Sequence, residues 1–221
     1  MNVESIDTYL CKDWLLHKHY AKRVPPIEYS FGLFINGYLQ GCCTFGTPVS
    51  NTLRNLWNNQ YKLIELNRLV VNDGLEKNSL SFFVSQCLKK LPKPLVIVSY
   101  ADSSKNHHGY IYQATNWKYT GLSKKMDEVC VKGMEHLHSG SIFDLSRGQK
   151  NRFQWLREKY GDDYYLRERS RKHRYFYFIG NKKDVKKMIL MNPYKVIPYP
   201  KGDNKRYDSS YNPIIQFNLF Q

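Results

Sequence analysis

The chain has 221 residues and carries 34 Lys and Arg against 19 Asp and Glu, a formal net charge of +15. Its 42% hydrophobic and 15% aromatic content excludes a disordered chain, and its length allows one large domain or two small ones. The mean hydropathy is −0.60, no long apolar run is present, and the N-terminus lacks the order of a signal peptide, so we expect no membrane span and no export.

The first 71 residues predict a helix, a hairpin and a long strand. Asn36-Gly37 is a type I′ turn signal between two runs of alternating apolar residues, which is typical of a β-hairpin. The expected elements are a helix at 8–16, a loop at 17–26, strands at 28–35 and 38–45, one or two helical turns at 51–57 and a strand at 61–71.

Turn signals after residue 71 separate a helix, a buried strand and several shorter elements. Ser79 can cap a helix that ends before Pro92, and the wholly apolar run 95–98 is typical of a central strand covered on both faces. The other expected elements are a helix at 108–114, a strand at 117–121, strands or extended segments at 129–134 and 141–143, a helix at 144–159, a strand at 174–179, a helix at 184–191 and an irregular tail at 203–221. This order predicts a mixed α/β sheet with helices on both faces.

The distribution of charge favours a nucleic-acid partner. Basic runs at 147–157, 167–174 and 182–187 alternate with aromatic residues, and such surfaces can bind phosphates while the rings stack on bases. A protein that is merely basic is the alternative. The candidate nucleic-acid contacts are Lys150, Arg152, Arg171, Lys172 and Arg174.

Two segments after predicted strands carry candidate chemistry. The loop 72–78 leads into a helix N-terminus, which suits a phosphate, although the loop is neither GxGxxG nor a P-loop. The segment 99–108 follows the buried strand and gathers Ser99, Asp102 and two histidines at a place where α/β sheets bind ligands. A Ser/His/Asp hydrolase is one interpretation, although no GxSxG elbow is present. A polar turn whose Asp and Ser cap the next helix is the equal alternative.

The histidine pair at 17 and 19 and the arginine at 68 are further candidates for binding a metal or an anion. Histidines 17 and 19, in a loop before the first strand, are either a weak metal signal or solvated side chains. Arg68 falls in phase with Ile64 and Leu66, so we expect it on their face, where a buried guanidinium needs an anionic partner. The five cysteines form no CxxC pair, which favours reduced thiols.

An ordered set of motifs resembles the Mom family of phage DNA-modification proteins, over residues 15–202. The segments that carry the resemblance are ELNRL at 65–69, KNS at 77–79, VSYAD at 98–102, HGYIYQATNW at 108–117, YTG at 119–121, REKYGD at 157–162, KHRY at 172–175 and PYPK at 198–201.

The resemblance implies a divergent GNAT-like acyltransferase fold that uses acetyl-CoA. It also implies a transferase whose product is adenine with a carbamoylmethyl group on N6 in double-stranded phage DNA, which shields the DNA from restriction in the host bacterial cytoplasm. We expect one catalytic domain at 1–202, with a basic aromatic DNA-binding region at 144–202.

The family's motifs imply site residues at matching positions. The expected catalytic residues are Asp102, Ser99, Tyr112, Arg68, His19 and Tyr20. The cofactor is expected at Val70, Val71, Asn78, Ser79 and Asn116. An iron site formed by His19, Tyr20 and Asp102 is an additional hypothesis. The alternatives to this function are an ordinary GNAT N-acetyltransferase and a non-catalytic DNA-binding protein.

Overall fold

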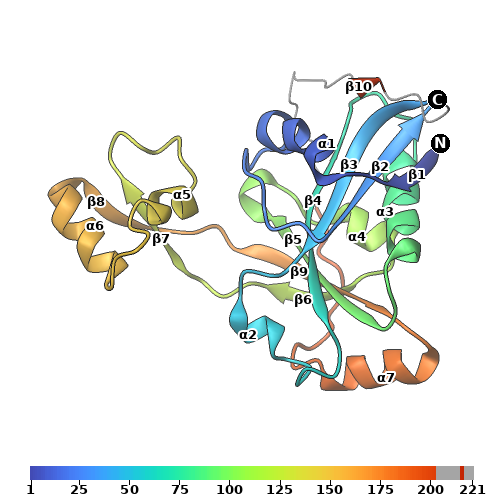
Figure 1. The fold of residues 1–221 in the computed structure, drawn as a ribbon. Helices are drawn as coiled ribbons and strands as arrows, with labels where there is room; N and C mark the ends of the chain where they lie inside the picture. The colour runs from blue at the N-terminus through green and yellow to red at the C-terminus, as the bar shows by residue number, and fades with distance from the viewer. Residues whose placement is uncertain (203–214, 217–221) are drawn as a thin grey trace. The chain divides into compact units, whose positions relative to one another are not determined.

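The computed structural model describes residues 1–202 and 215–216, and these fall into two compact units (Figure 1). The first unit holds Met1–Leu122 and the described residues from Lys172 on, and the second holds Ser123–Arg171. The basic region expected at 144–202 is therefore divided between the two units. The tail expected at 203–221 lies outside the described residues, apart from β10 (Ile215–Gln216), which pairs with β3.

The first unit is built on one mixed sheet. Its strand order is β1-β2-β3-β4-β5-β9-β6, and every neighbouring pair is antiparallel except β4 and β5, which are parallel. The strands are β1 (Asn2–Ser5), β2 (Tyr29–Ile35), β3 (Tyr38–Gly46), β4 (Leu63–Val71), β5 (Leu95–Asp102), β6 (Lys118–Leu122) and β9 (Lys172–Ile179). The predicted mixed α/β class is confirmed, whereas β1 was not predicted.

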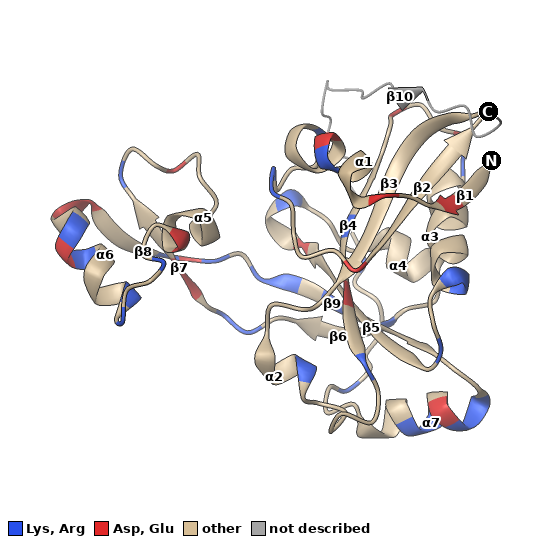
Figure 2. Ribbon diagram, in the orientation of Figure 1, with Lys and Arg blue, Asp and Glu red and all other residues tan. Residues whose placement is uncertain are grey.

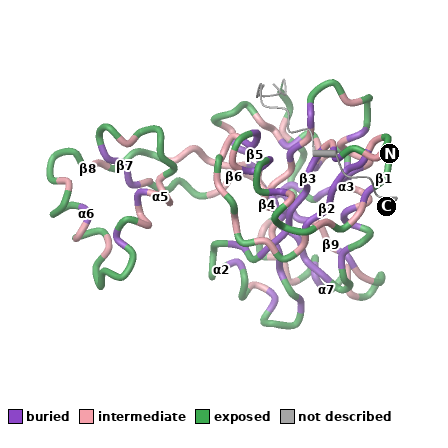
Figure 3. Tube along the Cα trace, turned by 45° about the horizontal axis from the view of Figure 1, so that its top comes forward, coloured by how far each residue is buried: buried purple, intermediate pink, exposed green. Residues whose placement is uncertain are grey.

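Helices cover both faces of this sheet (Figure 1), and buried residues run along its strands (Figure 3). On one face α3 (Ser79–Lys90) and α4 (Tyr110–Ala114) pack on Ile64, Leu66 and Ile97. On the other face α2 (Asn51–Arg54) and α7 (Lys182–Met191) pack on Val96 and Val98. Also on that face, α1 (Thr8–Asp13) and the π-helical turn η1 (Trp14–Lys18) pack on Cys42 and Val70.

A β-bulge changes the phase of β4. Thr44 pairs with Arg68 and Phe45 pairs with Leu66, so Asn67 is an extra residue with no register partner on β3, although its Oδ1 accepts from Thr44 Oγ1 at 2.6 Å. Leu69 packs with Ile64 and Leu66, and Val70 packs on the opposite face. The expectation that Arg68 shares the face of Ile64 and Leu66 is therefore wrong, because one extra residue reverses the alternation that follows it.

The second unit is a small module with its own core. Strands β7 (Asp127–Val131) and β8 (Tyr164–Glu168) pair antiparallel, and α5 (Ser139–Asp144) and α6 (Arg152–Tyr160) pack on them through Val129, Val131, Ile142 and Leu156. The strand or extended segment expected at 141–143 is helical, and the helix expected at 144–159 is broken. Gly148, at φ 88°, lies in the break, and Asn151 caps α6 by accepting from Gln154 N.

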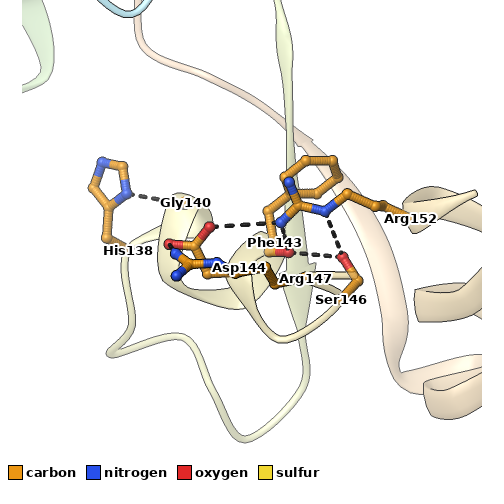
Figure 4. Close-up of polar contacts among 7 residues, drawn as sticks. All are labelled: His138, Gly140, Phe143, Asp144, Ser146, Arg147 and Arg152. Atoms are coloured by element: carbon orange, nitrogen blue, oxygen red, sulfur yellow. Dashed lines mark hydrogen bonds and ion pairs between the residues drawn. The ribbon is translucent and has the colours of Figure 1, made fainter. Parts of the chain in front are cut away.

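Arg152 joins the two helices of this module (Figure 4). Its guanidinium lies 3.8 Å over the Phe143 ring, its Nε donates to Ser146 Oγ at 3.1 Å, and its Nη2 donates to Phe143 O and lies 3.5 Å from Asp144 Oδ1. These contacts fix the turn between α5 and α6, so Arg152 stabilises the packing of the two helices in this module.

Substitution of Leu88 in α3 tests the assigned core of the first unit. Leu88 is 4% exposed, so Leu88→Ala should lower the free energy of unfolding by about 2–5 kcal/mol through the cavity that it leaves. Urea denaturation measures this loss. Lys89→Ala on the exposed side of the same helix is the control, and a cost equal to that of Leu88→Ala would contradict the assigned core.

Arg152 provides a second test. Arg152→Ala should speed amide hydrogen exchange throughout Ser123–Arg171 and leave β2 to β5 unchanged, because the guanidinium binds only partners within the second unit in the described chain. Arg147→Ala is the matched control, since Arg147 is 79% exposed and its Nη2 lies 3.3 Å from Asp144 Oδ2. Unchanged exchange in Arg152→Ala would show that the contacts of the Arg152 guanidinium do not stabilise the second unit.

Candidate functional site

A cavity of about 450 Å³ lies where β4 and β5 part. The two strands pair only from Leu63 with Val96 to Leu66 with Ser99, although β4 continues to Val71 and β5 to Asp102. The residues that line the cavity are Lys18, His19, Tyr20, Glu65, Leu66, Asn67, Arg68, Leu69, Val70, Val71, Asp73, Asn78, Leu80, Ser81, Tyr100, Ala101, His107, Gly109, Tyr110, Ile111, Tyr112, Ala114 and Lys172.

The cavity brings together most of the residues expected at the site from distant parts of the chain. Of the expected catalytic and cofactor residues it is lined by His19, Tyr20, Arg68, Val70, Val71, Asn78 and Tyr112. Ser99, Asp102, Ser79 and Asn116 are not among the lining residues, and the first two contact residues that are.

Ser99 closes the end of the parallel pairing. Its Oγ lies 2.8 Å from Leu66 O and 2.7 Å from Tyr112 OH. Because a serine hydroxyl has one proton and a carbonyl cannot donate, Ser99 donates to Leu66 and Tyr112 donates to Ser99. Burial raises the pKa of Tyr112, so its phenol keeps the proton at neutral pH.

Asp102 caps the turn that follows β5. Its Oδ1 accepts from Ser104 N at 3.0 Å and from Ser104 Oγ at 2.8 Å, and its Oδ2 lies 3.8 Å from Lys172 Nζ. The capping interpretation is therefore confirmed for this carboxylate. Its role in catalysis stays a prediction.

His19 is buried at the end of η1. The side chain is 5% exposed, its Nδ1 accepts from Ala21 N at 3.1 Å, and its ring stacks on Tyr20 with 4.5 Å between centroids. Burial lowers the pKa of His19 to about 3, and the charges of Arg68, His107 and Lys172 contribute to this shift. The imidazole is neutral at physiological pH.

The residues expected to hold iron do not fit that metal. No three His, Cys, Asp or Glu side chains are grouped as metal ligands anywhere in residues 1–202. The Ala21 N–H already occupies the Nδ1 lone pair of His19, and ligation through Nε2 would require a proton on Nδ1 facing that same N–H.

Arg68 contacts main-chain carbonyls. Its Nη1 donates to Asn67 O at 2.6 Å and its Nη2 donates to Arg23 O at 3.3 Å. The bulge at Asn67 places both Arg68 and Glu65 on the cavity, which period-2 alternation could not predict.

Lys18 and Asp73 are cavity residues to which the sequence assigned no role. Lys18 Nζ lies 3.0 Å from Asp73 Oδ2, and its side chain is 3% exposed against 39% for the aspartate. A lysine in a predicted loop gives no sign of burial. The π-helical turn that buries Lys18 is a backbone feature common at functional sites.

The start of α3 differs in detail from its prediction. Asn78, at φ 71°, takes the N-cap position, and Ser79 is the first helical residue. Ser79 is 1% exposed, and its hydroxyl has no hydrogen-bond partner within the described chain, so the predicted cap is wrong. Asn116, at φ 64°, lies in the turn between α4 and β6.

The expected nucleic-acid contacts have very different surroundings. Arg174 donates to Thr120 Oγ1 at 2.9 Å and lies 3.4 Å over the Tyr194 ring, and Arg171 Nε donates to Ser123 O at 2.7 Å. Lys150 is exposed. The second unit holds 11 Lys and Arg against 8 Asp and Glu, so most of the positive charge lies outside it (Figure 2).

A strongly basic segment of the first unit is 172–202, with 8 Lys and Arg against one acidic residue. Four of these are exposed lysines of α7, at positions 182, 183, 186 and 187. The acidic residue, Asp184, accepts from Tyr61 OH at 3.1 Å.

A mixed sheet whose parallel strands part around a cavity of polar, aromatic and aliphatic side chains is the arrangement in which α/β proteins commonly bind ligands. The chain belongs to the Mom protein family, whose model matches residues 1–201. None of the helices in the described ranges is long and apolar enough to cross a membrane.

One relative and two solved structures show what the chain is similar to. It is 29% identical over 209 residues to the methylcarbamoylase Mom of Escherichia phage Mu, covering 91% of this chain and 84% of that protein. A GNAT-family acetyltransferase of Bacillus cereus matches with a TM-score of 0.42 at 11% identity, over 80% of this chain and 96% of that one. A Bacillus subtilis acetyltransferase in complex with CoA matches with a TM-score of 0.37 at 10% identity, over 80% and 98%.

The low pKa of His19 makes stability depend on pH. An unfolded chain protonates this histidine near pH 6.5, whereas the folded chain keeps it neutral down to about pH 3. The unfolded state therefore binds more protons in this window, and the free energy of unfolding falls as the pH drops from about 7 towards about 4. Thermal unfolding at several pH values should show a steeper fall for the wild type than for His19→Asn, and parallel curves would contradict the assignment.

Proposed function

We propose that this chain is a DNA-modifying transferase that places a carbamoylmethyl group on N6 of adenine in phage DNA, in the host bacterial cytoplasm, and so shields that DNA from restriction. Family membership over residues 1–201 and the relation to a phage Mu methylcarbamoylase support the proposal. The observation that carries it is the cavity at the parting of β4 and β5, which gathers the polar groups that such chemistry needs.

One end of the cavity suits an acyl-CoA. β4 continues past Leu66 without a partner on β5 in the described chain, so its backbone can bind an amide-bearing ligand. Val70, Val71 and Asn78 would hold the pantetheine arm and the pyrophosphate near the start of α3. Bound there, acetyl-CoA would supply the two carbons of the added group. Because the product joins N6 to the former methyl carbon and ends in an amide, the reaction also requires a two-electron oxidant and an ammonia-level nitrogen that displaces the CoA thiol.

The buried hydroxyl of Tyr112 is placed to stabilise negative charge. It keeps its proton at neutral pH, and by exchanging its hydrogen bond to Ser99 for one to a ligand it would donate that proton to a carbonyl oxygen or a leaving thiolate. Asp102 would orient the N6 amino group or accept its proton, and Arg68 would bind a phosphate.

Aromatic side chains at the cavity suit a base taken out of the helix. An adenine stacked inside a duplex cannot reach a site within a cavity, so the target base must be flipped. Tyr20 meets the edge of His107 with 6.2 Å between centroids, and Tyr110 is 55% exposed where α4 begins. These rings offer stacking faces for a flipped base.

Basic side chains would bind the phosphates of the duplex. We infer direct contacts for Lys150, Arg171 and Lys172, and an indirect part for Arg152 and Arg174, whose guanidinium groups also hold their own units together. Each phosphate contact adds to the salt dependence of binding.

Mass spectrometry of nucleosides from plasmid DNA, recovered after expression of the protein in bacteria, tests the function. A deoxyadenosine with the mass shift of a carbamoylmethyl group is expected. A deoxyadenosine with an acetyl shift would favour the ordinary acetyltransferase. Unmodified DNA with a steep salt dependence of binding would favour the non-catalytic DNA-binding protein.

Tyr112→Phe tests the proposed acid. Removal of this hydroxyl should lower the yield of modified deoxyadenosine by about 100-fold or more, because a positioned proton donor contributes that much to a rate. Tyr110→Phe, which removes an exposed hydroxyl from the same helix, is the matched control and should keep its activity. Equal yields from the two variants, at equal thermal stability, would contradict the role of Tyr112.

A further inference from the structure

The outer side of α7 carries positive charge alone (Figure 2). Helical spacing places four exposed lysines on this side, and we call them the α7 lysine face: Lys182, Lys183, Lys186 and Lys187. Leu190, 76% exposed, continues the same side. The inner side packs on the core through Val185 and Met188, and there the carboxylate of Asp184 accepts from Tyr61 OH at 3.1 Å. The single acidic residue of the helix therefore lies outside the lysine face.

This arrangement of charge lowers the stability of the helix. Lys182 and Lys183 lie in the first turn, where the positive end of the helix dipole disfavours cations. Lys182 and Lys186 are four residues apart, as are Lys183 and Lys187, and like charges at this spacing repel each other. None of the four lysines forms an ion pair within the part of the chain that the structure describes. A negatively charged partner would therefore offset this repulsion.

The α7 lysine face lies at the end of the sheet opposite the cavity. α7 follows the end of β9, where Ile179 pairs with Leu95 at the start of β5. The cavity lies where β5 has parted from β4 after Ser99, and Lys172, the first residue of β9, lines it. A strand of this length spans roughly 23 Å, so the lysine face and the cavity are separate places on the first unit.

We propose that the α7 lysine face is a second DNA-binding surface, which binds backbone phosphates whatever the base sequence and at a distance from the reacting base. That the polyanion is DNA rests on the proposed function. The helix rises about 7.5 Å from Lys182 to Lys187, and a duplex presents about four phosphate charges over that length. Lysine side chains are flexible point charges, so they bind phosphates without reading a base. The surface would keep the protein on DNA while the cavity meets successive bases.

Acetylation footprinting of the full-length wild-type protein tests the place of this surface without any reference to activity. A 20-bp duplex made only of G·C pairs should slow acetylation of the α7 lysine face by sulfo-NHS acetate, because phosphate contacts carry no sequence information. Lys89, exposed on α3 at the other face of the sheet, is the control and should react at an unchanged rate. Lack of protection in α7, or protection only by a duplex that contains adenine, would overturn the proposal.

Replacement of the four lysines by glutamine tests their contribution to binding. The slope of log Kd against log salt concentration should become flatter by about 2–4, because each phosphate contact contributes about 0.9. The Tm should not fall, because the substitutions remove repulsion within the helix. A control variant loses the same charge from four other exposed lysines, at positions 12, 89, 90 and 132. An equal change of slope in the two variants would show an effect of net charge alone and would overturn the proposal.

These results stay distinguishable from a failure of the proposed function. If wild-type protein leaves plasmid DNA unmodified but α7 is protected and the glutamine variant has the flatter slope, the function is wrong and the second surface stands. If wild-type protein modifies adenine but the glutamine variant keeps the wild-type slope, the second surface is wrong and the function stands. In that case the lysine face would suit an acidic protein instead of DNA.

Discussion

The separation of β4 from β5 beyond Leu66 and Ser99 is the constraint on which the rest of the structure depends. Two parallel strands that part leave backbone N–H and C=O groups without hydrogen-bond partners on the neighbouring strand. Because a buried backbone group without a partner lowers stability, other groups nearby must bind it. Ser99 supplies one such partner by donating to Leu66 O, and Tyr112 in turn donates to Ser99. The same hydroxyl group that ends the pairing thus connects the sheet to a residue that lines the cavity.

The bulge at Asn67 determines which side chains of β4 face the cavity. Without the extra residue, Arg68 would point towards the core under α3 with Ile64 and Leu66. With it, Arg68 lies on the face of Val70, near His19 and the η1 turn, while Leu69 continues the core. A single inserted residue therefore supplies the cavity with a cation and preserves the hydrophobic packing on both sides.

Local sequence signals predict most strands of the sheet, but they predict only part of the candidate site. Asn36-Gly37 and the run Leu95–Val98 predict their elements because turn chemistry and continuous apolar character are local signals. The phase of Arg68, the burial of Lys18 and the break at Gly148 depend on tertiary pairing or on irregular backbone, which periodicity does not encode. The family motifs led to Tyr112 and His19, whereas no motif indicated that Ala21 N donates a hydrogen bond to His19 Nδ1.

The order β5-β9-β6 has a consequence for how the protein is made. Among the described strands, β6 pairs with β9, which the ribosome produces after the 49 residues of the second unit. The second unit, with its own core, can form earlier, while the main sheet must wait for a distant strand. Lys172, which lines the cavity, is the first residue of that strand. A nascent chain therefore lacks the complete lining of the cavity until Lys172 has been synthesised.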